Sequence, residues 1–160
     1  DIFPEEIRIA SSIIRSRLRE GARMYGAFWG ERLADYCWAV SQKPFYEISE
    51  ELFFQLGRRE SYLFDYRGIR KGRPLAFSRF VLMKALLRYA VMREEARAGE
   101  DLLFYSLVDV NNRPSRAFHE RYLRAEKVST LRLKIIFGEK SWKIPKNVSS
   151  LITPGKCLER

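Results

Sequence analysis

The strongest constraint on the fold of this chain is a long helical pattern, residues 78–98, between two strand-like segments. Its apolar residues recur at helical spacing: Val81, Leu82, Ala85, Leu86, Tyr89 and Met92. Residues 61–66 before it have a strand pattern. Residues 102–110 after it form a nearly continuous apolar run, typical of a strand buried on both faces. Strands separated by a helix, in a chain that also has hairpin signals, predict a mixed α/β fold.

The rest of the chain predicts further helices and strands. The helices expected are 4–20, with an apolar stripe at Ile7, Ala10, Ile14 and Leu18, then 49–56, ending at Gly57, and one capped by Asn112 with Pro114 in its first turn. The strands expected are 24–29 and 33–40, joined by a turn at Gly30-Glu31-Arg32, then 128–137 and a short strand around Trp142 after a turn at Gly138.

The chain of 160 residues has no internal repeat, low-complexity tract or flexible linker. We therefore expect one domain over residues 1–160, with an N-terminal helix in 1–20 and a C-terminal tail in 145–160. Because the sequence begins at Asp1 and not at Met, it stays open whether this domain is the later part of a longer protein.

Composition and cysteine spacing predict the compartment. The sequence contains no apolar run of the ~20 residues that span a bilayer, and its N-terminus lacks the pattern of a secretory signal. Cys37 and Cys157 lie far apart, which argues against a disulfide framework and against a zinc site. We expect free thiols in the cytoplasm and no bound metal.

The net charge of +10 points to an anionic partner: a nucleic acid, a membrane surface or a phosphorylated small molecule. A basic surface that is merely solvated is the alternative. Part of the charge gathers in the loop just before the long helix, at Arg67, Arg70, Lys71 and Arg73. A helix N-terminus binds anions through its unpaired N–H groups, and arginine adds paired donors for phosphate oxygens.

Two motifs carry a resemblance to a known family. Arg73-Pro74-Leu75-Ala76-Phe77-Ser78 lies in the register of a pyrophosphate-binding loop, Q/R-x-x-G-x-G/A, and residues 112–121, NRPSRAFHER, follow the pattern N-x-x-A/S-x-x-F/L-Y-E-K. Together with the hairpin over 24–40, they resemble the GNAT superfamily of N-acyltransferases, which transfer acyl groups from coenzyme A to amines. The resemblance covers roughly residues 22 to 138.

The resemblance implies an α+β domain whose mixed, mostly antiparallel sheet is flanked by helices. The family's fourth and fifth strands, here 61–66 and 102–110, would splay apart to accept the pantetheine arm of acetyl-CoA or another acyl-CoA. The acceptor would be an amine on a small molecule or a protein. The residues implied in coenzyme A binding are Arg70, Lys71, Arg73, Ala76, Phe77, Ser78, Arg79, Asn112 and Ser115.

The catalytic roles also come from the resemblance. His119 occupies the position at which family members often have a tyrosine that protonates the departing thiolate, and Tyr122, one turn further on, is the second candidate acid. Asp65 and Asp109 are candidate bases, since each stands in an apolar strand pattern. Pairing of Asp65 with an arginine, and a capping role for Asp109, are the simpler interpretations. Cys37 as a nucleophile served by His119 is an alternative to a small core residue.

A second hypothesis comes from the departures from the loop pattern. Ala76 and Ser78 fill both glycine positions, and Pro74 lacks a backbone donor. The alternative is therefore a non-catalytic GNAT-fold module that binds a protein or a nucleic acid through its basic surface. A homodimer stays open under either hypothesis.

Overall fold

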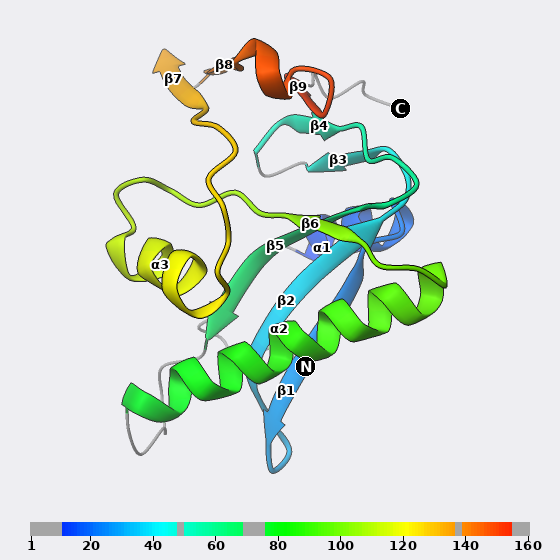
Figure 1. Cartoon of the computed structure of the whole chain (residues 1–160), viewed down its shortest axis with the longest axis vertical. Coiled ribbons are helices and arrows are strands. Elements are labelled where there is room, and N and C mark those ends of the chain that lie inside the picture. Colours follow the sequence, from blue (N-terminus) through cyan, green and yellow to red (C-terminus); the bar gives the residue numbers. More distant parts are fainter. Residues whose placement is uncertain (1–10, 48–49, 69–75, 137–138, 155–160) are drawn as a thin grey trace.

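The computed structural model describes residues 11–47, 50–68, 76–136 and 139–154 (Figure 1). Its main sheet has the strand order β1-β2-β5-β6. The elements of this unit are α1 (Ser11–Arg19), β1 (Arg23–Trp29), β2 (Arg32–Ser41), β5 (Glu60–Gly68), α2 (Ala76–Ala98) and β6 (Leu103–Tyr105). β1, β2 and β5 are antiparallel neighbours, whereas β6 is parallel to β5 and is reached through α2. The fold is therefore mixed α/β, of the mostly antiparallel α+β type.

Two smaller sheets complete the described structure. β3 (Phe45–Glu47), β4 (Leu52–Phe54) and β9 (Ile152–Pro154) form an antiparallel three-stranded sheet, and β7 (Arg132–Ile136) pairs with β8 (Glu139–Lys143). Between β6 and β7 lies α3 (Arg113–Ala117), which continues into the π-helical turn η2 (Phe118–Tyr122), and the 3₁₀ turn η3 (Lys146–Val148) follows β8. Of the helices within the described ranges, none combines the length and apolar character that a bilayer span requires.

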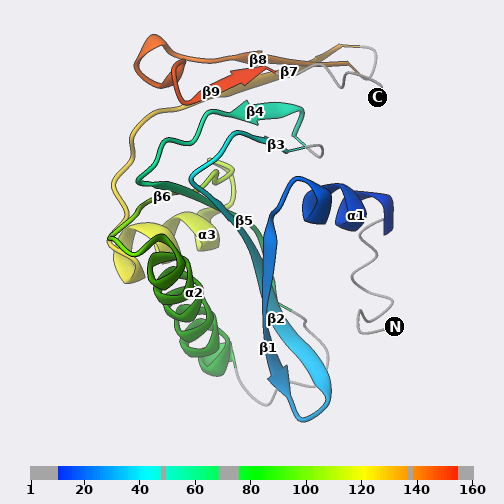
Figure 2. The same ribbon diagram turned by 90° about the vertical axis from the view of Figure 1, so that its right-hand side faces the viewer.

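The main sheet is covered on both faces (Figure 2). On the face toward α1, residues of β2 and β5 pack against the three-stranded sheet; this α1-side core contains Trp38, Val40, Tyr62, Phe64, Phe45, Leu52, Phe54 and Ile152. On the other face, β1 and β2 pack against α2; this α2-side core contains Tyr25, Cys37, Ala39, Met83, Leu86, Leu87, Ala90 and Phe118. A sheet buried on both sides explains why β2 is apolar along most of its length.

Several sequence predictions are confirmed. The hairpin at Gly30 joins β1 and β2, and α2 covers the expected helix 78–98, beginning two residues earlier. Asn112 caps α3, since its Oδ1 accepts a hydrogen bond from the backbone N–H of Ser115 at 3.1 Å. The first part of the helix expected over 4–20 and residue 137 of the strand expected over 128–137 lie outside the described residues.

One expected helix was wrong, and two expected strands are shorter than predicted. Residues 52–54 form β4 and not a helix, because Leu52 and Phe54 are buried and β4 pairs with the nearby β3 and with β9, which lies far along the chain. β6 has three residues, and the run 102–110 is not buried on both faces, since Leu103 and Val110 are 58% and 52% exposed. The strand expected over 128–137 begins at Arg132. Part of the expected tail, 152–154, is β9.

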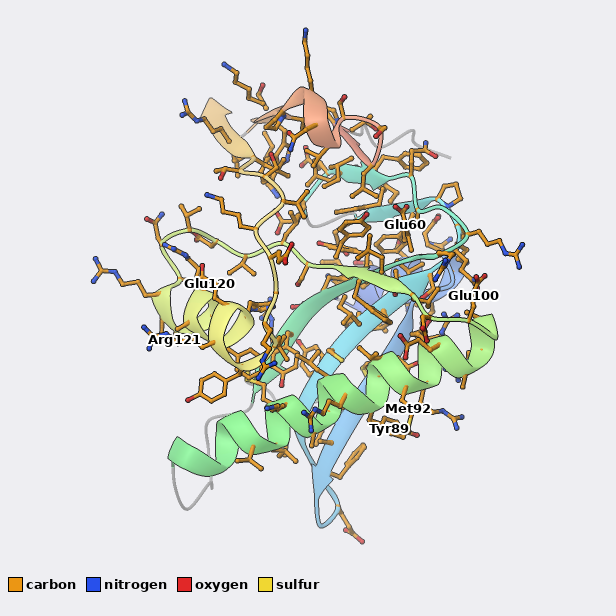
Figure 3. All side chains as sticks on the ribbon, viewed as in Figure 1. Glu60, Tyr89, Met92, Glu100, Glu120 and Arg121 are labelled. Atoms are coloured by element: carbon orange, nitrogen blue, oxygen red, sulfur yellow. The ribbon has the colours of Figure 1, made fainter. Side chains whose placement is uncertain are left out.

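The buried faces of the two long helices also differ from the predicted stripes. In α2, Met83, Leu86, Leu87 and Ala90 face the sheet, whereas Val81, Tyr89 and Met92 are exposed; Tyr89 and Met92 are labelled in Figure 3. In α1, Leu18 is exposed and Arg17 is buried. Apolar residues alone do not identify the inward face when both sides of a helix carry them, and Arg17 is buried because its charge is paired, as described below.

Glu94 is a buried anion on the α2-side face. It is 1% exposed and accepts hydrogen bonds from Arg23 Nε at 2.7 Å, from Ser41 Oγ at 2.6 Å and from the Tyr25 hydroxyl. Burial alone would raise the pKa of Glu94, but the hydrogen bonds from Arg23, Ser41 and Tyr25 outweigh it and lower the pKa below the usual range of a glutamate. Glu94 therefore ties the C-terminal half of α2 to β1 and β2.

We expect the substitution Glu94→Gln to lower the free energy of unfolding by about 2 kcal/mol, because glutamine has no negative charge for Arg23 and its NH2 group cannot accept the hydrogen bonds that one carboxylate oxygen accepts. Chemical denaturation at pH 7 measures this. Glu120→Gln is the matched control: Glu120 is exposed (Figure 3) and its only described ion pair, with Arg116 at 3.5 Å, is a surface pair, so its effect should stay within about 0.5 kcal/mol. Equal effects of the two substitutions would contradict the role of Glu94.

The contribution of Glu94 should also depend on pH. Because its pKa in the folded state is lowered, the stabilisation is present above the pKa of an unfolded glutamate, about 4.3, and is lost as the pH falls through the folded value. Denaturation curves from pH 7 to pH 3 should show the difference between the wild type and Glu94→Gln narrowing below about pH 5. A difference that is constant or grows on acidification would show that the charge of Glu94 is not stabilising.

Candidate functional site

The candidate site lies where β5 and β6 separate. These parallel strands pair only through Glu60 with Leu103, Ser61 with Phe104 and Tyr62 with Tyr105. One further contact follows, in which Ser106 Oγ donates a hydrogen bond to the Leu63 carbonyl at 2.9 Å. Beyond it β5 continues to Gly68, while the chain after β6 turns away toward α3 (Figure 1). Ligands of α/β sheets bind outside the carboxyl ends of parallel strands, which makes this opening the first candidate for a binding site.

A β-bulge in β5 lies at this opening. Trp38 of β2 pairs with Phe64 and Tyr36 pairs with Arg67, so that β5 contains one residue more than β2 between the two pairs. Asp65, inside this interval, has a φ of +43°, in the left-handed region that non-glycine residues rarely adopt. The extra residue changes the alternation of side chains, because Phe64 belongs to the α1-side core whereas Tyr66 packs on the α2-side core.

Tyr66 connects the bulge to the helical segment after β6. Its ring stacks on that of Phe118, with centroids 6.5 Å apart, and Phe118 in turn stacks on Tyr122 at 6.0 Å. Phe118 is 1% exposed, whereas Tyr122 is 51% exposed and lies at the outer end of the stack. Phe118 therefore docks η2 on the α2-side face, next to the segment of β5 that contains the bulge.

His119 follows Phe118 on η2 and is partly exposed. Its Nδ1 lies 2.8 Å from the carbonyl oxygen of Ser115. Because a carbonyl oxygen only accepts hydrogen bonds, Nδ1 carries a hydrogen, and in the neutral ring Nε2 keeps its lone pair. The structure thus brings four of the predicted site residues, Asn112, Ser115, His119 and Tyr122, onto the continuous segment α3–η2.

The two candidate bases have partners other than His119. Asp65 faces α1: its Oδ2 accepts a hydrogen bond from Arg17 Nη1 at 2.5 Å and its Oδ1 from Arg67 Nε at 2.8 Å. Asp109 is exposed, and its Oδ1 accepts the backbone N–H of Asn111 at 2.8 Å. Pairing with arginine and local capping, the simpler interpretations of these carboxylates, are what the structure contains, and we assign neither of them as a base.

The predicted phosphate-binding residues fall partly outside the described residues. Arg70, Lys71 and Arg73 belong to residues 69–75, which the structure does not describe, so their role stays a prediction. Ala76 to Arg79 form the first turn of α2, where the leading N–H groups of a helix have no partner within the helix. Their backbone is therefore of the kind that binds anions, in the place the sequence indicated.

Cys37 is a core residue and not a nucleophile. It is fully buried in the α2-side core, and burial, together with the carboxylates of Asp35 and Glu94, raises the pKa of its thiol to about 12. A thiol with so high a pKa supplies almost no thiolate at neutral pH. Within the described part of the chain, histidine, cysteine and carboxylate side chains form no cluster of three that could hold a metal ion.

Sequence reasoning missed the buried charges on the two faces of the main sheet. Arg17 Nη2 pairs with Glu47 Oε1 at 3.0 Å, and both side chains are buried in the α1-side face beside Asp65. Glu47 alternates with the buried Phe45, and Glu94 lies four residues after the buried Ala90, so each carries the signal of a charge at an apolar position. Nothing in the sequence marks Arg17, which lies outside the predicted stripe of its helix.

Comparisons of this chain with protein-family models, with curated proteins and with solved structures found no match. The site must therefore be interpreted from its own geometry and from its motifs.

We expect the Cys37 thiol to be unreactive in the folded protein. In the variant Cys157→Ser, which leaves Cys37 as the one cysteine, Ellman's reagent at pH 8 should show no thiol in the native state and one thiol per chain after unfolding in guanidinium. At a pKa of about 12 the thiolate fraction at pH 8 is on the order of one in ten thousand. Rapid reaction of the native variant would contradict the burial of this residue.

Proposed function

We propose that this chain is a GNAT-type N-acyltransferase that moves an acyl group, from acetyl-CoA or another acyl-CoA, to an amine. The observation that carries the proposal is the pair β5 and β6: β6 pairs with β5 over its three residues, after which β5 continues through a bulge and the chain after β6 leaves it. The motif Asn112–Arg121 forms the helical segment beside that opening. This position would bring His119 close to a thioester bound there.

The separated strands support binding of the pantetheine arm. This arm is an extended chain with two amide groups, which can hydrogen-bond to strand backbone as an added strand does. Beyond the Ser106 contact with Leu63, the described ladder contains no further pair between β5 and β6, and the arm would lie along β5 past this point. In the proposal, backbone N–H groups at the bulge polarise the thioester carbonyl.

The diphosphate is proposed to lie at the start of α2. The N–H groups of Ala76, Phe77, Ser78 and Arg79 would face the phosphate oxygens, and Arg70, Lys71 and Arg73 would supply cationic donors. The absence of glycine at positions 76 and 78 restricts how closely the backbone approaches the phosphates, and these basic side chains would supply the compensating contacts.

His119 is proposed to transfer the proton. As the amine nitrogen forms its bond to the carbonyl carbon, Nε2 accepts the amine proton, and the resulting imidazolium is stabilised by the hydrogen bond from Nδ1 to Ser115. As the carbon–sulfur bond breaks, the imidazolium returns this proton to the departing thiolate. The Tyr122 hydroxyl is the second candidate proton donor for this last step. Its side chain is about half exposed to solvent, more than that of His119.

Calorimetry and a thiol-release assay test the proposal. Coenzyme A and acetyl-CoA should bind the full chain at one site, and acetyl-CoA with a panel of amines should release thiol. His119→Gln should lower turnover by about 100-fold or more and leave the Kd for coenzyme A within about twofold, because His119 acts on the proton and not on the diphosphate. Tyr122→Phe separates the two candidate acids, and Glu120→Gln is the control on the same turn.

Two results would count against these assignments. No binding of coenzyme A at millimolar concentration, together with no thiol release, would overturn the acyltransferase proposal. Normal turnover of His119→Gln with a loss in Tyr122→Phe would move the acid role to Tyr122 while keeping the function.

A further inference from the structure

We propose that Arg17 is a positioning residue of this site: from α1 it holds Asp65 in the left-handed conformation that creates the bulge of β5. The bulge in turn sets where β5 leaves β6 and where η2 docks. The consequence for ligand binding rests on the proposed acyl-CoA site, but the conformation of β5 can be measured without reference to it.

Asp65 needs an external restraint to keep its conformation. Residues in strands have φ near −120°, and a left-handed φ of +43° brings the Cβ of an L-residue close to the neighbouring carbonyl. Aspartate tolerates this region better than most residues, but usually in turns, where its side chain bonds its own backbone. Here the carboxylate instead bonds Arg17, a side chain from another element.

Arg17 is itself fixed from several directions. Its two terminal nitrogens bond different carboxylates, Nη1 that of Asp65 at 2.5 Å and Nη2 that of Glu47 at 3.0 Å. Its guanidinium also lies over the rings of Phe64 and Trp38, at 5.0 and 5.4 Å from their centroids. Burial alone would lower the pKa of Arg17, but Glu47 and Asp65 outweigh it and raise the pKa, so the side chain stays a cation.

The second partner of Asp65 is weaker. Arg67 Nε bonds Oδ1 at 2.8 Å, but the Arg67 side chain is more than half exposed, and exposed ion pairs are screened by solvent. Arg17 therefore supplies the more rigid restraint. It is also the one that connects α1, β3 and the bulge in a single set of contacts.

The restraint on one face of the sheet determines the position of a site on the other face. With the bulge, Tyr66 points to the α2-side core and stacks on Phe118, which precedes His119. Without the extra residue, regular alternation would turn Tyr66 toward α1 and remove this stack. Arg17 thus acts through Asp65 on the course of β5 and on the position of the candidate acid, which lies on the other face of the sheet.

A matched set of variants tests this role. Arg17→Lys keeps a cation for Glu47 but loses the fork that reaches both carboxylates. Two double variants combine Arg17→Lys with Asp65→Gly or with Asp65→Ala. Both substitutions at residue 65 remove the carboxylate, but only glycine adopts a positive φ without steric cost. Arg19→Lys, at the exposed end of α1, is the control.

Two measurements separate positioning from general stability. The first is the β2–β5 register, from NMR contacts between Tyr36 and Arg67 and between Trp38 and Phe64. The second is the Kd for coenzyme A by calorimetry. We expect R17K and R17K/D65A to weaken binding by about tenfold and to lose the Tyr36–Arg67 contact, whereas R17K/D65G and R19K should bind within about threefold of the wild type with the register unchanged.

The single variants Asp65→Gly and Asp65→Ala, which leave Arg17 paired with Glu47, repeat the comparison should R17K unfold. The proposal is overturned if R17K keeps the wild-type register and affinity, if D65A behaves like D65G, or if glycine at 65 fails to rescue R17K. Wild-type protein that does not bind coenzyme A would overturn the proposed function alone, and the register would then decide the role of Arg17.

Discussion

The bulge in β5 is the constraint on which most of this structure depends. β5 is paired on both sides, with β2 and with β6, and its side chains enter the cores on both faces of the sheet. One extra residue at Asp65 changes which side chains face which core. The single strand segment Phe64–Arg67 therefore couples the packing of α1, the docking of η2 and the separation of β5 from β6.

Buried charge holds the sheet in this arrangement from both sides. On the α1 face, the Arg17 cation is surrounded by Glu47, Asp65 and two aromatic rings; on the α2 face, the Glu94 anion accepts hydrogen bonds from Arg23, Tyr25 and Ser41. Desolvation makes such groups costly, and in each cluster several oppositely charged or hydrogen-bonding partners offset that cost. Because these partners are directional, the two clusters fix the register of helices and strands more narrowly than apolar contacts can.

Much of the fold could be predicted from local patterns, and the failures have a common cause. The hairpin at Gly30, the helix 78–98 and the cap at Asn112 depend on turn chemistry, periodicity and capping, which act within a few residues. β4 and β9 are strands only because each pairs with a segment distant in the sequence, and Val81, Tyr89 and Met92 are exposed only because the sheet packs on the other side of α2. Of the candidate site, the helical segment with His119 and Tyr122 could be predicted, whereas the pairing of Asp65 with Arg17 could not.

The sequence by itself determined the types of most elements, the mixed α/β class and the motifs that place a candidate acid after a capped turn. These features depend on local backbone preferences and side-chain spacing. Only the tertiary structure decided which charges are buried, which face of each helix is covered and where the parallel strands separate. The physical reason is that burial and ion pairing arise between residues far apart in the chain, such as Arg17 with Asp65 and Arg23 with Glu94, and no local pattern records which partner will be present.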